Sequence, residues 1–349
     1  MSERQLNLLR EDACQALRNV TKDQLGNKVA LLTGASGLIG SHFLAGFVQL
    51  QREGAFNGVV HAVTRRPPPA FARELTAHSR ITFHRGELDD QAFLQSLPQA
   101  DIVIHAATYG QPGLFTAHPQ ATLKLNTLTT FGLLEKTNPD GRFLFLSSSE
   151  LYSGLANPPY SENQIGTTNT THARACYIEG KRCGEAICNS YRQTGIRAKS
   201  ARLALAYGPG TRPGDRRVLN MFIEKALRQN EIKLLDDGAA RRTYCYISDA
   251  MHMLWSILMD GREAVYNVGG VSRTTIAQLA QSIGGLAGVP VQIPASAEGG
   301  MAGAPDDVRL DISRFENEFG RMTFAPLEYG LRRAIDWQRD FDLGEMGPG

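Results

Sequence analysis

The residues with the clearest chemical potential lie in the stretch ACYIEGKR, residues 175–182, where Tyr177 and Lys181 stand four positions apart. On a helix this spacing places both side chains on one face, about one turn apart. A nearby ammonium lowers the pKa of a phenol, so such a pair can take or give a proton. The same spacing occurs by chance on ordinary amphipathic helices, and the rest of the chain must decide between the two readings.

A glycine-rich loop, TGASGLIG, lies near the start of the chain between an apolar run and a helical pattern. In such a loop Gly34 permits a tight turn, Gly37 lets a pyrophosphate approach the backbone, and Gly40 lets the helix pack on the strand. The helix N-terminus offers amide donors to the anion. A glycine-rich turn without a ligand is the alternative, but the strand–loop–helix order favours dinucleotide binding. The loop lacks the lysine of a nucleoside-triphosphate site.

The next strand ends in Thr64, Arg65 and Arg66, without the acidic residue that accepts from the adenosine ribose in many NAD enzymes. Arginines there suit the 2′-phosphate of NADP, although stacking on adenine or exposure to water would also explain them. The expected cofactor is therefore NAD or NADP. The residues of the loop and strand ends expected to contact it are Gly34, Ser36, Gly37, Leu38, Ile39, Gly40, Thr64, Arg65, Arg66, Glu87, Leu88, Ala106 and Ala107. His105, beside this set, is expected to be a satisfied core residue.

Short apolar runs alternate with longer helical patterns through the first two thirds of the chain. This alternation predicts βαβ units and a parallel sheet with ligands at the carboxyl ends of its strands. The predicted strands are 28–34, 58–64, 81–88, 101–107, 142–149 and 198–208, and the helices between them include 38–51, 119–137 and 173–194. The expected fold class is α/β, a Rossmann-type doubly wound parallel sheet.

After residue 208 the elements become shorter and more mixed, which predicts a smaller C-terminal α/β substrate lobe packed on the sheet. Helices are expected at 218–229, at about 249–260, from Thr274 or Thr275 onward, and at 326–340. The predicted division is a helical extension over 1–26, a dinucleotide-binding domain over 27–208 and a substrate lobe over 209–349.

Composition narrows the possible partners of the chain. Its 349 residues carry a formal net charge of +2 without a dense Lys/Arg run, so no nucleic-acid partner is expected. No apolar run is long enough to span a bilayer, and the N-terminal residues lack the apolar segment of a secretory signal. The five cysteines form no CxxC pair and no His/Cys/Asp cluster has ligand spacing, so reduced thiols, a cytoplasmic location and no metal are expected.

The motifs taken together resemble those of the extended short-chain dehydrogenase/reductase family, which contains nucleotide-sugar epimerases, dehydratases and decarboxylases. The resemblance covers roughly residues 27–340 and rests on TGASGLIG, DIVIHAA, SSSELYSG, the Tyr177–Lys181 spacing, YGPG, RTYCYISDA and YNVGG in the family order. It implies that Ser148, Tyr177 and Lys181 form a catalytic triad, with Tyr177 as the acid/base at a sugar hydroxyl. Tyr177 and Lys181 would both contact the cofactor, and Lys181 would bind the nicotinamide ribose and lower the pKa of Tyr177.

Ser149 and Glu150 extend the implied catalytic set. In relatives that react at C5 of a hexose, a carboxylate follows the catalytic hydroxyl by two positions, and Glu150 occupies that place. It would abstract the C5 proton of a 4-keto sugar or assist loss of the C5 carboxylate. A purely structural hydrogen-bonding role is the alternative.

The sequences of three stretches, RACYIEGKR, GDRRVLNMFIEKAL and RRTYCYISDAM, are most similar to those of the UDP-glucuronate decarboxylase branch. By that resemblance Arg217 and Arg242 would contact the nucleotide diphosphate, and Arg309 the substrate carboxylate. The chain departs from the branch at Leu205, where an asparagine normally helps to hold the nucleotide sugar. A 4,6-dehydratase or a C4/C5 epimerase therefore remains an alternative, and a non-catalytic dinucleotide sensor a more remote one.

The expected ligand is a nucleoside-diphosphate sugar, and the expected assembly is a homodimer. Relatives dimerise through two helices of each subunit, which match segments 119–137 and 173–194. The apolar residues considered for this contact are Leu123, Leu133, Leu134, Ile187 and Tyr191. Burial against their own sheet is the alternative.

Overall fold

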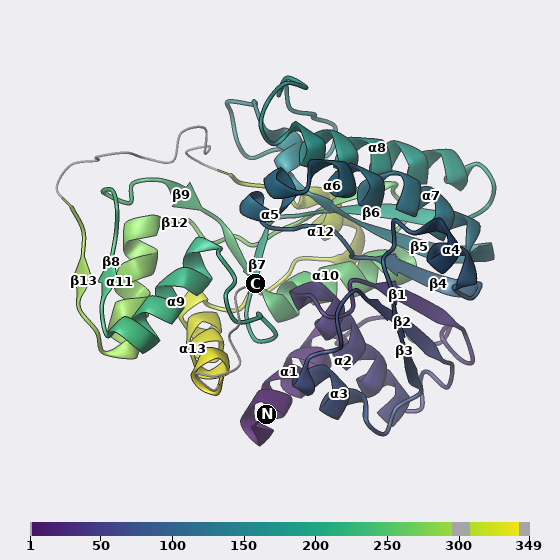
Figure 1. The fold of residues 1–349 in the computed structure, drawn as a ribbon, viewed down its shortest axis with the longest axis horizontal. Coiled ribbons are helices and arrows are strands. Elements are labelled where there is room, and N and C mark those ends of the chain that lie inside the picture. Colours follow the sequence, from purple (N-terminus) through teal and green to yellow (C-terminus); the bar gives the residue numbers. More distant parts are fainter. Residues whose placement is uncertain (1, 295–307, 342–349) are drawn as a thin grey trace.

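A seven-stranded parallel sheet forms the centre of the protein (Figure 1). The computed structural model describes residues 2–294 and 308–341. The strand order is β11-β6-β5-β4-β1-β2-β3, and every pairing between neighbours is parallel. The strands are β1 (Ala30–Thr33), β2 (Val60–Thr64), β3 (Ile81–Arg85), β4 (Ala100–His105), β5 (Thr137–Ser148), β6 (Arg197–Leu203) and β11 (Val265–Val268).

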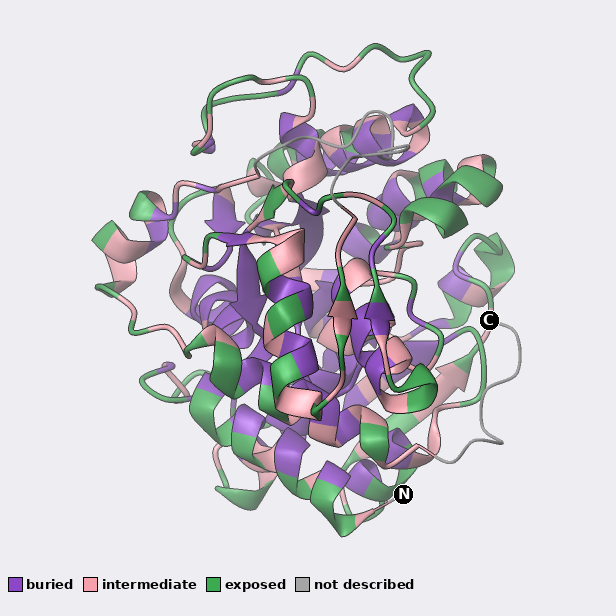
Figure 2. Ribbon diagram, turned by 90° about the vertical axis from the view of Figure 1, so that its left-hand side faces the viewer, coloured by how far each residue is buried: buried purple, intermediate pink, exposed green. Residues whose placement is uncertain are grey.

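Two hydrophobic cores cover the two faces of this sheet, as the alternation of side chains along a strand requires. Ala30 and Leu32 of β1 face a core built with α1 (Glu3–Ala16), α2 (Leu38–Arg52) and α10 (Ile247–Asp260). Leu31 faces the opposite core, built with α7 (Leu128–Glu135) and α8 (Ala175–Arg192). The sheet is accordingly buried along most of its length in Figure 2. This arrangement confirms the predicted Rossmann-type fold.

Two predicted elements are divided in the structure. The expected helix over 119–137 is interrupted at Thr127, whose backbone has φ −117° and ψ −80°, and gives α6 (Pro119–Asn126) and α7. The expected strand over 198–208 ends at Leu203, and β7 (Leu205–Tyr207) pairs with β10 (Tyr244–Tyr246) outside the main sheet. Four short helices were not predicted, namely α3 (Ala70–Thr76), α4 (Gln91–Ser96), α5 (Pro112–Ala117) and α12 (Ser313–Phe319).

The C-terminal part forms a smaller lobe beside the carboxyl ends of the strands (Figure 1). It contains α9 (Val218–Gln229), α11 (Ile276–Ala287), α13 (Leu327–Arg339) and the short strands β8 (Ile232–Lys233), β9 (Arg241–Arg242), β12 (Thr274–Thr275) and β13 (Val291–Gln292). Two elements from the same part, α10 and β11, instead belong to the main sheet and its covering layer. The predicted division at residue 208 stays a prediction, because the chain returns to the main sheet through α10 and β11 before it continues into the lobe.

The N-terminal helix α1 is integrated into the main core. Leu9 and Ala13 are buried in that core. Asp12 accepts hydrogen bonds from the Tyr246 hydroxyl and from Arg333 of α13, at 2.8 and 3.0 Å. The extension therefore fastens the C-terminal lobe to the helices of the main sheet.

A buried ion pair attaches α8 to the sheet. Arg202 of β6 donates through Nε and Nη2 to the carboxylate of Glu185, at 2.9 and 2.8 Å. Ser147 of β5 donates to the same carboxylate at 2.5 Å. The remaining arginine nitrogen donates to the Tyr152 hydroxyl and to two loop carbonyls. All three nitrogens of this guanidinium thus hold a helix, two strands and a loop in one arrangement.

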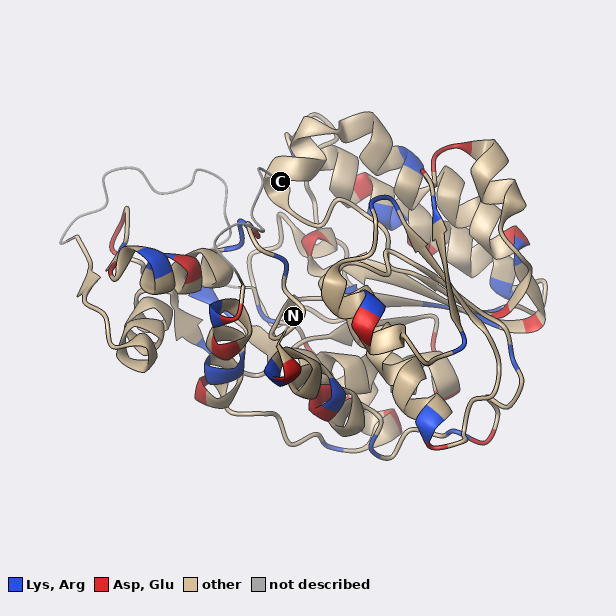
Figure 3. Ribbon diagram, turned by 60° about the horizontal axis from the view of Figure 1, so that its bottom comes forward, with Lys and Arg blue, Asp and Glu red and all other residues tan. Residues whose placement is uncertain are grey.

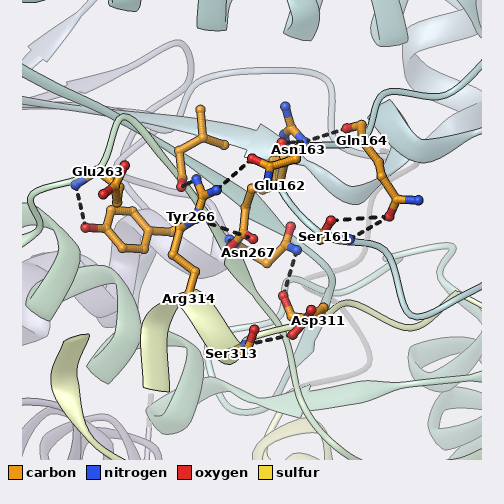
Figure 4. Close-up of polar contacts among 12 residues, drawn as sticks. Ser161, Glu162, Asn163, Gln164, Glu263, Tyr266, Asn267, Asp311, Ser313 and Arg314 are labelled. Carbon is orange, nitrogen blue, oxygen red and sulfur yellow. Dashed lines mark hydrogen bonds and ion pairs between the residues drawn. The ribbon is translucent and has the colours of Figure 1, made fainter. Parts of the chain in front are cut away.

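Asn267 of β11 continues this network to the loop at 153–168 (Figure 4). Its backbone N–H donates to Glu162 at 2.8 Å, and its side-chain amide donates to the carbonyls of Tyr160 and Asp311, each at 2.8 Å. The Tyr152 hydroxyl donates to the Asn267 side-chain oxygen at 2.6 Å. The asparagine of the YNVGG motif is therefore a buried junction between the edge strand, this loop and the segment at 308–312.

Removal of one partner from the Arg202–Glu185 pair is expected to be strongly destabilising, because it leaves an uncompensated buried charge. We expect Arg202→Met to lower the free energy of unfolding in urea by about 3–5 kcal/mol. The matched control is Arg332→Met, which breaks the exposed pair between Arg332 and Glu328 of α13 and should cost less than about 0.5 kcal/mol. Equal effects of the two substitutions would contradict the structural role assigned to Arg202.

Candidate active site

The glycine loop has the geometry of a phosphate cradle. Gly34 has φ +68°, and a Cβ there would lie 2.6 Å from the carbonyl of Ala106. A Cβ on Gly40 would lie 2.1 Å from the Gly34 oxygen, so only glycine allows α2 to pack this closely on the loop. Gly37 is the N-cap of α2 and provides no side chain there, which leaves the first amides of the helix available to an anion. Gly34 and Gly40 thus allow the loop to pack closely on its own backbone, and the amides at the start of α2 are the expected donors to a dinucleotide pyrophosphate.

The neighbouring strand ends supply the remaining walls of this cradle. The buried Thr64 hydroxyl at the end of β2 has no hydrogen-bond partner among the described residues. Arg65 donates to the Tyr109 hydroxyl at 2.5 Å, and Arg66 is exposed. Glu87 is exposed and Leu88 is buried at the end of β3. An unsatisfied hydroxyl beside the glycine loop is a further indication that the cofactor completes this part of the site.

His105, at the end of β4, is a structural residue as expected. Its Nδ1 shares a hydrogen bond of 2.9 Å with Thr33, and its Nε2 lies 2.8 Å from the carbonyl of Leu125. Burial lowers its pKa to about 3, so the ring is neutral near pH 7. Thr33 also accepts from the backbone N–H of Ala107. These contacts hold Ala106 and Ala107 against the glycine loop.

Tyr177 and Ser148 are brought together at the carboxyl end of β5. Ser148 forms a hydrogen bond with the Tyr177 phenol, which lowers its pKa, but burial has the larger effect and raises that pKa to about 12. Positive charge on Arg217 and Arg174 also lowers the pKa, whereas the charge on Glu150 raises it. The expected lowering by Lys181 is not among these influences. In the protein without cofactor, Tyr177 is therefore a neutral phenol at neutral pH.

Lys181 lies one turn from Tyr177 on the buried face of α8. Its Nζ donates to the carbonyl of Leu146 at 2.5 Å and lies 4.6 Å from the ring centroid of Phe145 and 5.7 Å from that of Tyr177. Burial lowers the lysine pKa to about 7, against an opposing effect of the Glu185 charge. The two residues thus occupy the predicted common helix face, and the amine is anchored to the strand before it.

Glu150 is paired with an arginine that the sequence analysis did not single out. Arg174, the residue before α8, donates through Nη1 to both Glu150 oxygens at 3.1 and 3.0 Å. Its guanidinium lies over the ring of Phe115, which in turn stacks on Tyr177 at a centroid distance of 4.6 Å. Ser149 and Glu150 form a short 3-10 turn after β5, and the Ser148 hydroxyl accepts from the Glu150 N–H. The carboxylate is therefore fixed beside the phenol by a neighbouring charge.

The sequence alone gives little indication that Phe115 and Arg174 lie beside Tyr177 and Glu150. Arg174 is part of RACYIEGKR, but its charge is aimed at Glu150 by the turn that precedes α8. Phe115 belongs to α5, a helix of six residues that carries no strong pattern. Only the packing of α5 on α8 reveals that this ring covers the Tyr177 phenol.

The three predicted substrate arginines come from different segments of the C-terminal part: Arg217 precedes α9, Arg242 lies in β9, and Arg309 precedes α12. Arg217 is held by Asp215 through contacts of 2.5–3.1 Å and acts electrostatically on Tyr177. Arg242 donates to the carbonyl of Arg241, and Arg309 donates to that of Pro158. Arg217 is thus placed near the triad, whereas the roles of Arg242 and Arg309 stay predictions.

Within residues 2–294 and 308–341 no group of three or more His, Cys, Asp or Glu side chains could hold a metal ion. In the same part of the chain, no helix has the length and apolar character needed to cross a membrane. Lys/Arg and Asp/Glu positions occur together on several helices in the view of Figure 3.

Comparison with known proteins assigns the chain to a family. Residues 30–269 match the model of the NAD dependent epimerase/dehydratase family. UDP-glucuronic acid decarboxylase 1 of Xenopus tropicalis is 30% identical over 318 residues, which cover 89% of this chain and 72% of that protein. UDP-glucuronic acid decarboxylase 6 of Arabidopsis thaliana is 29% identical over 269 residues, 76% of each chain. The chain belongs to the NAD dependent epimerase/dehydratase family, as its motifs predicted.

Solved structures agree on the fold. A dTDP-glucose 4,6-dehydratase from Streptomyces venezuelae, with NAD bound, aligns with a TM-score of 0.74 at 23% identity and covers 89% of this chain and 97% of its own. A UDP-glucuronic acid 4-epimerase from Bacillus cereus, with NAD and a fluorinated UDP-glucuronic acid bound, aligns with a TM-score of 0.73 at 22% identity, covering 88% and 98%. The predictions of an enzyme of this family and of NAD as cofactor are confirmed, and NADP is untested.

The lowered pKa of Lys181 predicts a specific pH dependence of stability. The pKa is about 7 in the folded protein and near 10.5 for an ordinary lysine. Between these values the unfolded chain binds one more proton, so the free energy of unfolding should rise with pH from about 7 to 10.5, by up to ~1.4 kcal/mol per unit. Urea denaturation of cofactor-free protein should show this slope, reduced in Lys181→Met. Parallel curves for the two proteins would contradict it, since the other buried lysine, Lys199, contributes to both.

Proposed function

We propose that the protein converts a nucleoside-diphosphate sugar through a 4-keto intermediate, and that it is a UDP-glucuronate decarboxylase-like enzyme. The observation that carries this proposal is the convergence of Ser148, the Tyr177 phenol and the arginine-paired Glu150 at one end of the sheet. Membership of the family and the decarboxylase relatives support it. The glycine loop and the strand ends around it would hold the dinucleotide.

The first step requires removal of a proton from the C4 hydroxyl of the sugar. Tyr177 is placed to take this proton, with Ser148 hydrogen-bonded to its phenol. The positive charges of Arg217 and Arg174 favour the phenolate and so oppose the effect of burial. A bound nicotinamide would supply the acceptor for the C4 hydride and the source for its return, so that the cofactor would undergo no net change.

The second step depends on the carboxylate at C5. With a ketone at C4 the substrate is a β-keto acid, so the bond between C5 and the carboxylate can break with release of carbon dioxide. The electron pair passes to the C4 oxygen, where the phenol of Tyr177 can donate a hydrogen bond. Glu150, held by Arg174, would bring a negative charge near the substrate and so favour loss of the C5 carboxylate.

A 4,6-dehydratase or a C4/C5 epimerase is the second candidate, and Glu150 is the residue that supports it. A carboxylate two positions beyond Ser148 could remove the C5 proton of a 4-keto sugar that has no carboxylate to lose. Such an enzyme would act on an uncharged nucleotide hexose. The remote alternative, a non-catalytic sensor, would bind the dinucleotide without turnover of any sugar.

Incubation with UDP-glucuronate should release carbon dioxide, and Tyr177→Phe should reduce the rate by at least ~100-fold because the proton acceptor at C4 is lost. Tyr177→Phe and the companion variant Glu150→Gln should both retain the melting temperature and dinucleotide affinity of the wild type, which separates an effect on chemistry from an effect on folding. Glu150→Gln is the companion variant and should lower kcat more than it changes KM. Turnover of an uncharged nucleotide hexose, without carbon dioxide release from UDP-glucuronate, would instead establish the dehydratase or epimerase.

The proposal includes a homodimer formed through α6, α7 and α8. Of the residues first considered for this contact, Leu133, Leu134 and Ile187 are buried in the core of their own subunit. These three residues therefore pack against their own sheet, which was the alternative to an interface. Leu123, Leu128 and Phe131 of the same helices are 39%, 64% and 42% exposed. Exposed large apolar side chains on neighbouring helices are typical of an interface. The expected cytoplasmic location stays a prediction.

Leu128→Asp combined with Phe131→Asp should convert a dimer into a monomer, because two charges would be buried in the contact. Light scattering after size-exclusion chromatography should give twice the chain mass of 38.2 kDa for the wild type and the single mass for the variant. Leu235→Asp, at a residue 79% exposed on the C-terminal lobe, should leave the dimer intact. A wild-type protein with the single mass would exclude this assembly.

A further inference from the structure

Two histidines on neighbouring strands of the main sheet are in direct contact. The Nδ1 atom of His61 on β2 lies 2.9 Å from the Nε2 atom of His84 on β3, and the ring centroids are 5.1 Å apart. The parallel register pairs His61 with Thr82 and Val63 with His84, so both imidazoles project from the same face of the sheet. No other two histidines of the described residues are in hydrogen-bond or ring contact. Strand pairing creates this contact, because the two residues lie 23 positions apart in the chain.

Both rings can offer a nitrogen lone pair at neutral pH. Burial lowers the pKa of His61 and of His84, and the charge of His84 lowers that of His61 further, so the rings are neutral. A neutral imidazole carries hydrogen on one nitrogen and a lone pair on the other. The outer nitrogens, His61 Nε2 and His84 Nδ1, have no hydrogen-bond partner among the described residues. Hydrogen can therefore reside on both outer nitrogens when an ion replaces the hydrogen bond between the inner ones.

The separation of the inner nitrogens fits two ligands of one metal ion. Bonds from a divalent ion to imidazole are about 2.0–2.1 Å long, so two nitrogens bound at a right angle lie ~2.9 Å apart. The same bonds at a tetrahedral angle require ~3.3 Å. The observed separation of 2.9 Å favours the right angle of octahedral or square-planar coordination. Among ions that adopt such geometries, nickel(II) and copper(II) are suited to imidazole.

The pair lies where an ion can reach it. β3 is an edge strand of the sheet, and Thr82, directly opposite His61, is exposed. Both histidines are half-buried, so the strands hold the rings in place while each ring can turn slightly to direct its lone pair at a shared ion. Two protein ligands leave positions for water on the open side. Such a site is smaller than the three-residue groups that the described part of the chain lacks.

We propose that His61 and His84 bind one divalent nickel or copper ion, which bridges β2 and the edge strand β3. The unfolded chain does not hold the two imidazoles at this separation, so the bound ion stabilises the folded state. The site requires neither the dinucleotide nor the sugar, and it is independent of the proposed function.

The test uses untagged, full-length protein that has been treated with a chelator and returned to chelator-free buffer. Isothermal titration calorimetry with Ni²⁺ should show a site that His61→Gln and His84→Gln each weaken by at least ~10-fold, since even the loss of a residue behind a metal ligand costs about this much. The matched control is His78→Gln, at an exposed histidine in the loop before β3, which should leave the affinity unchanged. Mg²⁺, which prefers oxygen ligands, should not bind there.

Two further measurements locate the ion. Crystals soaked in nickel chloride should give an anomalous difference peak about 2.1 Å from both His61 Nδ1 and His84 Nε2. The melting temperature of the wild type should rise with Ni²⁺ concentration, whereas those of the two substituted proteins should rise much less. Their melting temperatures without metal show that both variants are folded.

Two outcomes would overturn the proposal. Equal Ni²⁺ affinity of the wild type, His61→Gln and His84→Gln would assign the ion to other groups, such as the exposed thiols of Cys14 and Cys183. A wild type that binds no Ni²⁺ would leave the contact as a hydrogen bond between the strands. Neither result affects the proposed function, which is tested by carbon dioxide release.

Discussion

The buried ion pair between Glu185 and Arg202 is the contact on which the geometry of the site depends. Tyr177, Lys181 and Glu185 follow one another at four-residue steps along α8, so they share one face of the helix. Glu185 is bound to β6 through Arg202 and to β5 through Ser147. This attachment fixes both the rotation and the axial position of α8 relative to the strand end that carries Ser148. The buried pair therefore determines where the phenol lies, although it takes no part in the chemistry.

Burial tunes the two reactive groups of this helix in opposite directions. It raises the pKa of the Tyr177 phenol to about 12 and lowers that of the Lys181 amine to about 7, because in each case the neutral form is favoured in an apolar environment. Charges from outside the triad, on Arg217 and Arg174, work against the effect on the phenol. The segment from Tyr109 to Phe115 links these parts of the site, since it contacts Arg65 at one end and Tyr177 at the other. The proposed cofactor side and the proposed catalytic side are thus connected through one short stretch of chain.

Much of the fold could be predicted because its signals are local. The apolar runs of β1, β2, β4 and β5 and the glycines of the first loop identify strands and a turn within a few residues each. The break at Thr127 was missed, since the apolar pattern of 119–137 continues through it and the division arises from packing. The transfer of β11 to the main sheet was also hidden, because a four-residue strand does not indicate its partner.

The sequence by itself determined the family, the position of the glycine loop and the candidates Ser148, Tyr177, Lys181 and Glu150, because these depend on residue type and short spacing. Only the tertiary structure decided which charges surround them. Arg174 reaches Glu150 across 24 positions and Arg212 reaches Ser36 across 176, and no local pattern encodes such contacts. It also decided the direction in which the pKa of Tyr177 moves. That direction depends on burial by distant segments, and burial is a property of the folded chain rather than of the motif.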